Sequence, residues 1–393
     1  MRAPGQPEST THAGRQPNQR PRSDREDANP ARSVALPWHT RALCRSLVRA
    51  HCPLLSQLFP PRALVFALAV ILAISVVILA QSLGLASGRE THGPSSLPTP
   101  GEGGEMRFLF SLTGRIDQYL DTPLAVTVSR RGLVYVADGG YRSVQVFSPD
   151  GVWQRSIGRA IVAEPRPGDL VYPLGVAVDD QDNCYVSDNV TGRISVFDST
   201  GAFLRYFAED EAGAKPFGLP AGLFFRNGLL YVNDVGNHQV MALRSDGTIE
   251  RVFGRGRGSE TGQMQYPNFS WVDEWGRVYV ADSNNNRIQI FGSDGAFQGV
   301  FASGHEGPET GVMRGIALDS RGDMHVVATM EHRVLVFDQD GQFMYSYGRE
   351  GDGPGQLGFP NGLAVAGDQV YVADRANGRV QVWSLGAKLE NTR

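Results

Sequence analysis

The chain has 393 residues, with 37 basic and 41 acidic side chains and a net charge of −4. Only three cysteines occur, which excludes a disulfide-stapled scaffold and a cysteine-rich zinc module. Residues 1–62 hold ten Arg and four acidic residues, so +6, whereas residues 84–393 hold 27 basic and 37 acidic residues, so −10. An acidic main body argues against nucleic acid as a partner.

Residues 63–83 predict a transmembrane helix, because they read ALVFALAVILAISVVILAQSL and carry no charge. A helix of this length is about 31 Å long, enough for a hydrocarbon core about 30 Å thick. Four arginines lie within residues 41–62, whereas only Arg89 follows the span closely. Positive charge stays on the cytoplasmic side, so we expect a cytoplasmic N-terminus and an extracytoplasmic main body.

The alternative interpretation of this segment is a cleaved signal peptide. The apolar part of a signal peptide is usually about 7–15 residues and lies near the N-terminus. Here 62 residues precede a longer apolar stretch, which favours an uncleaved anchor in the cell membrane.

The remaining boundaries follow from composition. Residues 1–62 are rich in Arg, Pro, Gln and Ser and predict a disordered cytoplasmic tail. Residues 84–105 are mostly Gly, Ser, Pro, Thr and Glu and predict a flexible stalk. We expect residues 106–385 to form one globular domain and residues 386–393 a short C-terminal tail.

A repeat of about 47 residues fills the predicted domain. The clearest copy reads Val-Tyr-Val-Ala-Asp at Val278–Asp282 and ends in an apolar segment at Phe291. The final Asp recurs every 46 to 50 residues, at Asp138, Asp188, Asp234, Asp282 and Asp374, with Ala328 in the fifth of six copies. Each copy contains four short apolar or alternating segments joined by turns, which is typical of propeller blades.

The two ends of the domain predict how the ring closes. The last copy ends at Leu385 after its third strand. Phe108–Leu112 matches the fourth strand of the fifth copy, Phe343–Tyr347. We therefore expect the N-terminal strand to complete the sixth blade, which leaves no open sheet edge.

The repeated residues resemble a known family. Pro-x-Gly-x-Ala-x-Asp, as at Pro173–Asp179, together with Tyr-Val-Ala-Asp and Asn-x-Arg-Ile-x-Ile-Phe in the fourth copy, is similar to the NHL repeat. The resemblance covers the whole domain and implies an all-β, six-bladed propeller. In that family the first strand of each blade lines the central channel and the fourth is outermost. Function is not implied, because NHL propellers have many roles.

The repeated Asp predicts a structural role. It ends the second strand before a turn, where a carboxylate accepts turn N–H groups and pairs with a following arginine such as Arg193, Arg287 or Arg379. A residue found in nearly every blade serves the blade itself, so we prefer this role to metal binding.

Binding residues are expected where blades differ. The loops that lead from the fourth strand of one blade into the first strand of the next are long and varied, and we expect them to form the binding face. Their residues are 159–172, 209–219, 255–266, 303–312 and 349–359. At the channel mouth on this face we predict a ligand site made of Asn268, Arg314, Asn361, Tyr266 and Trp271. The alternative is ordinary blade variation, with Trp271 filling the core.

Catalytic and metal-binding patterns are weak. His238 and His332 share one repeat position, and we place them roughly 17 Å apart from a strand spacing of ~4.8 Å. One zinc ion binds its ligands at about 2.0–2.1 Å, so the two cannot share it. We find no match to the several histidines around zinc in the peptidyl-hydroxyglycine amidating lyase propellers. No catalytic residue, metal or other cofactor is predicted.

These features together favour a membrane-anchored binding, scaffold or sensor propeller that recognises a protein, a peptide or a cell-envelope glycan. The alternative is a propeller enzyme of lyase or lactonase type that acts at the channel mouth. The sequence leaves enzymatic activity open and leans toward binding.

Overall fold

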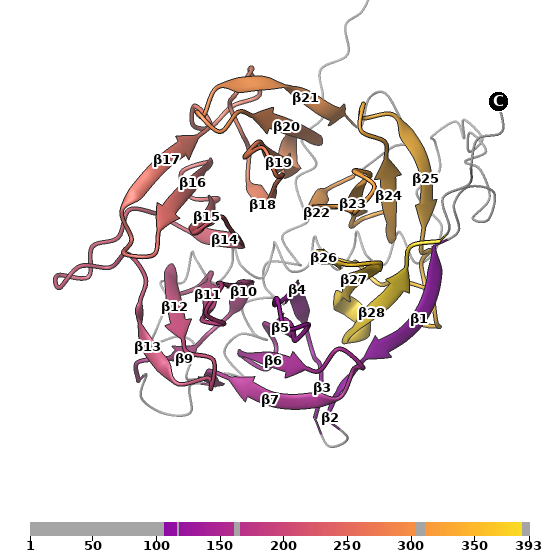
Figure 1. The fold of residues 1–393 in the computed structure, drawn as a ribbon, viewed down its shortest axis with the longest axis horizontal. Helices are drawn as coiled ribbons and strands as arrows, with labels where there is room; N and C mark the ends of the chain where they lie inside the picture. The colour runs from indigo at the N-terminus through magenta and orange to yellow at the C-terminus, as the bar shows by residue number, and fades with distance from the viewer. Residues whose placement is uncertain (1–105, 116–117, 161–165, 304–310, 387–393) are drawn as a thin grey trace, which may run out of the picture. The chain divides into compact units, whose positions relative to one another are not determined.

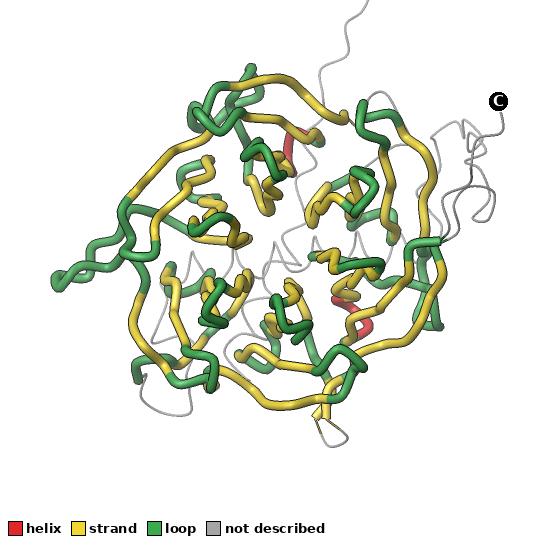
Figure 2. Tube along the Cα trace, in the orientation of Figure 1, coloured by secondary structure: helices red, strands yellow, loops and turns green. Residues whose placement is uncertain are grey.

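The computed structural model describes residues 106–115, 118–160, 166–303 and 311–386. These residues form six four-stranded antiparallel sheets around a central axis (Figure 1). In this part of the chain the helical segments are two short 3-10 helices, η2 (Ser283–Asn285) and η3 (Arg375–Asn377). Strands and turns make up the rest (Figure 2). The predicted all-β, six-bladed propeller is confirmed.

The blades follow one another in sequence. Blade one contains β4 (Pro123–Val128), β5 (Val134–Asp138), β6 (Ser143–Phe147) and β7 (Trp153–Ile157). Blade two contains β10 (Pro173–Val178), β11 (Cys184–Asp188), β12 (Arg193–Phe197) and β13 (Phe203–Tyr206). Blade three contains β14 (Pro220–Arg226), β15 (Leu229–Asp234), β16 (Gln239–Arg244) and β17 (Ile249–Phe253). Blade four contains β18 (Pro267–Val272), β19 (Val278–Asp282), β20 (Arg287–Phe291) and β21 (Phe297–Ser303).

Blade five contains β22 (Met313–Leu318), β23 (Met324–Ala328), β24 (Arg333–Phe337) and β25 (Phe343–Tyr347). Blade six contains β26 (Leu363–Ala366), β27 (Gln369–Asp374), β28 (Arg379–Ser384) and β1 (Arg107–Leu112). Two short strand pairs lie between blades: β2 (Gly114–Arg115) with β3 (Gln118–Tyr119), and β8 (Arg159–Ala160) with β9 (Asp169–Leu170).

The inner and outer strands differ in sequence because they meet different surroundings. β5 and β19 both read Val-Tyr-Val-Ala-Asp, and every residue in them is buried. Valine and tyrosine suit a strand that neighbouring blades cover on both faces. β7, an outer strand, alternates partly buried and exposed residues up to the buried Ile157. The predicted order, with the first strand innermost and the fourth outermost, is seen in Figure 1.

The core lies between blades. Among the described residues, each of the six junctions between adjacent blades holds one cluster of buried apolar side chains. Two aromatic residues of β18 extend this core into the channel. Phe269 packs against the cluster between blades one and two, and Trp271 packs against the clusters beside blade five. The centre of the ring is therefore filled by side chains below its rim.

The ring closes as predicted. β1 pairs antiparallel with β28, with Phe108 opposite Trp383 and Leu112 opposite Val380. Leu112 is 1% exposed and belongs to the cluster between blades six and one. Figure 1 shows the indigo β1 outside the yellow β28, so the two ends of the domain share one blade.

The predicted membrane span, residues 63–83, lies outside the described residues, as do the predicted tail and the predicted stalk. Within the described ranges, no helix has both the length and the apolar character that a membrane crossing requires.

Removing β1 should destabilise the domain. A chain that starts at Gly114 lacks the fourth strand of blade six and exposes β28 and its cluster. Burial of a leucine such as Leu112 alone is worth about 2–5 kcal/mol. We expect a melting temperature at least roughly 5 °C below that of a chain starting at Gly101, with more aggregation. Equal melting temperatures and solubility in thermal unfolding would contradict this account of closure.

Candidate functional site

One face of the propeller carries the loops between blades and the turns between second and third strands, and we call it the long-loop face. The repeated Asp connects each loop to the turn of its blade by hydrogen bonds. In blade two, Asp188 is 1% exposed and accepts the backbone N–H groups of Val171 at 2.6 Å and Tyr172 at 3.0 Å. It also accepts two N–H groups of its own turn, from Val190 and Thr191. The same set of contacts surrounds Asp138 and Asp234. The predicted structural role is confirmed.

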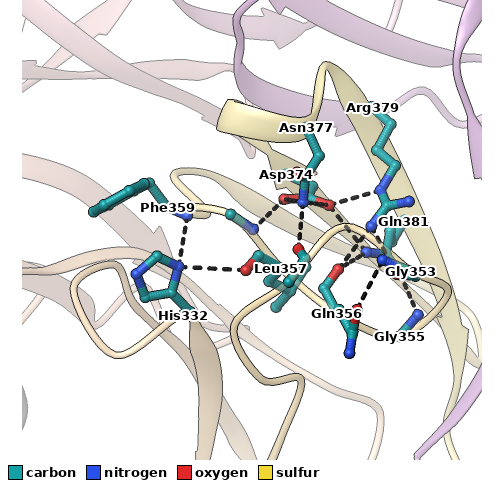
Figure 3. A network of polar contacts seen from close by, with 12 residues as sticks. His332, Gly353, Gly355, Gln356, Leu357, Phe359, Asp374, Asn377, Arg379 and Gln381 are labelled. Carbon is teal, nitrogen blue, oxygen red and sulfur yellow. Dashed lines mark hydrogen bonds and ion pairs between the residues drawn. The ribbon is translucent and has the colours of Figure 1, made fainter.

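In blades four and six, side chains instead donate most of the hydrogen bonds that this carboxylate accepts. Asp374 accepts Arg379 Nε at 2.7 Å, Gln381 Nε2 at 3.0 Å and the Asn377 amide at 2.9 Å (Figure 3). Only one backbone N–H of the incoming loop, from Gly358 at 2.6 Å, still reaches it. Asp282 has the equivalent partners: Arg287, Gln289, Asn285 and the Gln265 N–H.

In blades four and six, the backbone N–H of the residue before the first proline does not bond to the repeated Asp. It bonds instead to a histidine of the preceding blade. Phe359 donates its N–H to His332 Nδ1 at 3.2 Å, and Tyr266 donates to His238 Nδ1 at 3.2 Å. Both aromatic residues have left-handed backbones, with φ of 46° and 53°. Such a conformation is unusual for a bulky residue and marks stored strain.

These two contacts also present aromatic rings on the long-loop face. The Phe359 ring lies 4.3 Å from the His332 ring, and the Tyr266 ring lies 5.0 Å from the His238 ring. Phe359 is 40% exposed and Tyr266 41%, whereas both histidines are buried. Figure 3 shows Phe359 and His332 to one side of the Asp374 network. The histidines therefore position aromatic rings on the rim.

Among the described residues, no group of three or more His, Cys, Asp or Glu side chains is arranged to hold a metal ion. The repeat position of His238 and His332 is left-handed in all six blades, with Arg142, Gly192, Asn286 and Gly378 in the others. Histidine is one of the residues that tolerate this conformation.

One predicted arginine contact is wrong. Arg193 does not pair with Asp188: its Nε and Nη2 bind the Glu209 carboxylate at 2.9 Å each, and its guanidinium lies 4.5 Å from the Tyr206 ring. A bidentate carboxylate in the neighbouring loop competes better than an Asp already occupied by four N–H groups. Arg287 and Arg379 pair as predicted.

Blade five lacks the Asp and uses a different acceptor. Glu331 Oε1 accepts the Gly311 N–H at 2.6 Å, and the Thr329 N–H bonds to the Val312 carbonyl. The loop is thus still tied to the turn, but through a residue three positions later in the chain. Met330, next to Glu331, is 56% exposed on the long-loop face.

The predicted site residues Asn268, Arg314 and Tyr266 come together at the channel mouth. The Asn268 amide donates to the Tyr266 carbonyl at 3.0 Å and to Ser283 Oγ at 2.8 Å. Its Oδ1 accepts Arg314 Nη1 at 3.4 Å. These contacts join blade four to blade five beside the rim.

Arg314 is partly buried and lacks a counter-charge in the described part of the chain. Its Nε is buried without a hydrogen-bond partner, and its hydrogen bond goes to the neutral Asn268. Burial, together with the nearby charge of Arg375, lowers the pKa of Arg314. The Tyr172 hydroxyl, from blade two on the opposite side of the ring, opposes this and raises the pKa of Arg314.

The other two predicted residues lie away from the surface of the mouth. Asn361 is 1% exposed and donates to the Leu124 carbonyl at 2.7 Å, so it holds blade six against blade one. Trp271 lies four residues beyond Pro267 on β18, about 13 Å along the strand. Its ring centre is 4.5 Å from that of Phe224, and it packs against the apolar clusters beside blade five.

Sequence reasoning missed four residues near this mouth: Tyr172, Met330, Phe359 and Arg375. Tyr172, Tyr266 and Phe359 share the position before the first proline of blades two, four and six. That shared position is a signal in the sequence. The exposure of Met330 and the charge of Arg375 near Arg314 follow only from the folded loops.

A cavity of about 270 Å³ opens on the opposite face. Turns of blades one to three line it, including Arg130, Asp179, Asp180 and Arg226. Arg130 and Asp180 pair with each other at 2.8 Å, so one of the two arginines in this cavity already has a counter-charge.

Comparisons with known proteins agree with the fold. The NHL repeat model matches residues 272–291 and 357–383, which lie in blades four and six. The chain is 30% identical over 73 residues to Protein brain tumor of Drosophila melanogaster; the match covers 18% of this chain and 7% of that protein. The chain thus spans only a small part of this relative.

Solved propellers are similar in shape. A virginiamycin B lyase from Staphylococcus aureus is 14% identical, with a TM-score of 0.50, over 72% of this chain and 100% of that one. A gluconolactonase from Xanthomonas campestris is 18% identical, with a TM-score of 0.51, over 75% and 99%. At these identities the similarity shows the fold alone.

The His238 contact should make stability pH-dependent. Burial, and then the charge of Arg257, lower the pKa of His238 from its ordinary value of 6.5, although Asp234 and Asp282 oppose this. Because the pKa of His238 is lower in the folded state, the neutral histidine contributes to the stability of the fold at pH values above its ordinary pKa. This contribution to stability is lost as the pH falls through the pKa of the folded state. The loss has a structural cause, because a protonated His238 no longer accepts the Tyr266 N–H.

The matched variant is His238→Asn, since Asn286 occupies this left-handed position in blade four. Between about pH 7.5 and about pH 5, we expect the wild-type melting temperature to fall more than that of the variant. Parallel pH profiles in the two proteins would contradict the assignment.

Proposed function

We propose that this protein is a membrane-anchored propeller that binds a ligand carrying a negative charge at the mouth of its channel, outside the cytoplasm. The ligand class is a protein, a peptide or an envelope glycan. The protein serves as a scaffold or sensor, with Arg314 as the central contact and Asn268 and Tyr266 beside it.

The observation that carries this proposal is the state of Arg314. A cation removed from water without a paired anion is unfavourable, and proteins usually pair such groups. Here the described surroundings supply a neutral amide, a tyrosine hydroxyl and a second cation, Arg375. An anionic ligand would pair with the guanidinium and offset the repulsion between the two arginines. Arginine suits this task because its planar guanidinium binds carboxylates with two parallel hydrogen bonds.

Membrane anchoring rests on the sequence. The uncharged residues 63–83 and the +6 tail support an uncleaved anchor with the propeller outside.

Topology can be tested by protease protection. Protease added to intact spheroplasts should digest the propeller or the segment before it and spare residues 1–62. An antibody against the tail then detects a short protected fragment that includes the span. Digestion of the tail with a protected propeller would reverse the proposed orientation, and release of the propeller without protease would indicate cleavage.

Ligand binding can be tested with Arg314→Ala, with Arg349→Ala as the control because Arg349 is exposed on the same face. Envelope proteins, peptides and glycans retained by the immobilised full chain in detergent are quantified by mass spectrometry. We expect Arg349→Ala to retain the same molecules as wild type. Arg314→Ala should deplete at least one by more than about tenfold, the value of a partly desolvated charge pair.

Thermal unfolding of the same variants separates the two roles of Arg314. A melting temperature close to wild type is expected, because the residue makes one long hydrogen bond. A large loss of stability would show that Arg314 holds blades together, and an unchanged set of retained molecules would contradict a site at the mouth.

A further inference from the structure

Three exposed apolar side chains lie around Arg314 on the long-loop face. Tyr266 precedes blade four, Met330 lies in the turn of blade five and Phe359 precedes blade six, and each is at least 40% exposed. We call these three residues the apolar collar. Arg314, on blade five, lies between the blades that carry the two aromatic rings.

The collar is linked to Arg314 through Asn268 on one side and through the chain of blade five on the other. Asn268 bonds to both the Tyr266 carbonyl and Arg314. On the other side, Met330 belongs to the same turn as His332, and His332 accepts the Phe359 N–H. A Cβ atom on Gly311, three residues before Arg314, would lie 2.9 Å from Met330 Cβ. Cation and collar are therefore parts of one surface.

The backbone conformation and the histidine contacts of Tyr266 and Phe359 hold their rings in exposed positions. Tyr266 and Phe359 have left-handed backbones, and each is held by a buried histidine of the preceding blade. The equivalent Tyr172 gives its N–H to Asp188 and has no left-handed backbone. Strain of this kind persists only when surrounding contacts impose it, and it clusters at ligand sites.

We propose that the apolar collar and Arg314 together bind an extended peptide segment of a protein partner, in which a carboxylate is flanked by apolar side chains. This inference rests on the proposed function and deepens it. The carboxylate pairs with Arg314, and the flanking side chains pack on Tyr266, Met330 and Phe359.

A peptide fits this surface better than a glycan because of the hydrogen bonds available. The Asn268 amide is already bonded on both sides, and Asn361 is buried between blades. Met330 and Phe359 offer no side-chain donor. Sugar hydroxyl groups placed on Met330 and Phe359 would lose water without gaining partners there, whereas the apolar side chains of a peptide have no polar group that needs one. Exposed methionine is also typical of surfaces that bind varied peptide side chains.

The spacing of the collar sets a minimum length. The rings of Tyr266 and Phe359 lie beside His238 and His332, which belong to blades three and five. From strand spacings we place these histidines roughly 17 Å apart, a distance that about five extended residues span. A segment of this length reaches both rings with its carboxylate near the middle.

The test uses the full chain in detergent micelles and fluorescence anisotropy with defined probes. One probe pool contains nonapeptides with a central Glu and flanks of Leu, Phe, Met and Val. Matched pools replace the central Glu by Gln, or the flanks by Ser and Asn. A fourth pool carries its only carboxylate at a free C-terminus, and an oligogalacturonate supplies carboxylates on a glycan.

We expect the Glu-centred apolar pool, the C-terminal carboxylate pool or both to bind at least tenfold tighter than the Gln-centred and Ser/Asn pools. Arg314→Gln should remove this preference. Tyr266→Ala and Phe359→Ala should each weaken binding by roughly threefold to tenfold, as for exposed aromatic contacts in interfaces. Trp275→Ala is the control, because Trp275 is 68% exposed but lies in a turn on the opposite face.

Three results would overturn the inference in different ways. Arg314-dependent binding of oligogalacturonate without binding of any peptide pool would leave the proposed function intact and refute the peptide. Binding of neither probe class, together with unchanged retention of envelope molecules by Arg314→Ala, would refute both. Equal effects of Trp275→Ala and Phe359→Ala would show that the collar is not the contact surface.

Discussion

The fold depends on one buried carboxylate per blade and on what occupies its two oxygens. The Asp at the end of the second strand is fully buried in five blades, so each of its lone pairs must find a donor. In blades one to three the donors are backbone N–H groups of the incoming loop and of the turn. The carboxylate thereby fixes where each loop enters its blade, and the first strand starts beside the channel in the same way each time.

Competition for those oxygens explains how blades differ without losing the fold. In blades four and six, Arg, Gln and Asn side chains take places that backbone groups hold elsewhere. The displaced N–H would be buried without a partner unless another acceptor replaced the Asp. The histidines of blades three and five are those acceptors, and the chain adopts a left-handed residue to reach them. The NHL repeat model matches blades four and six, in which Arg, Gln and Asn side chains all bond to the repeated Asp.

Local rules predicted the parts of the structure that repeat. Strand positions, blade number and the closure by Phe108–Leu112 follow from short segments whose neighbours are set by topology, and they were right. Contacts that depend on a choice between partners were harder to predict. Arg193 had both Asp188 and Glu209 within reach, and nothing in the repeat shows that the second wins. Asn361 and Arg314 share a repeat position, yet Asn361 bonds to a backbone carbonyl of the next blade and Arg314 to a side-chain amide of the preceding one.

Apolar side chains of β18 lie inside the ring, whereas Asn268 and Arg314 lie at its rim. Phe269 and Trp271 replace small residues of the repeat and fill the axis with apolar atoms. Asn268 and Arg314, near the starts of β18 and β22, are only partly buried. Arg314 belongs to blade five, which lacks the repeated Asp. Its turn is held through Glu331 instead, and Met330 of the same turn is 56% exposed.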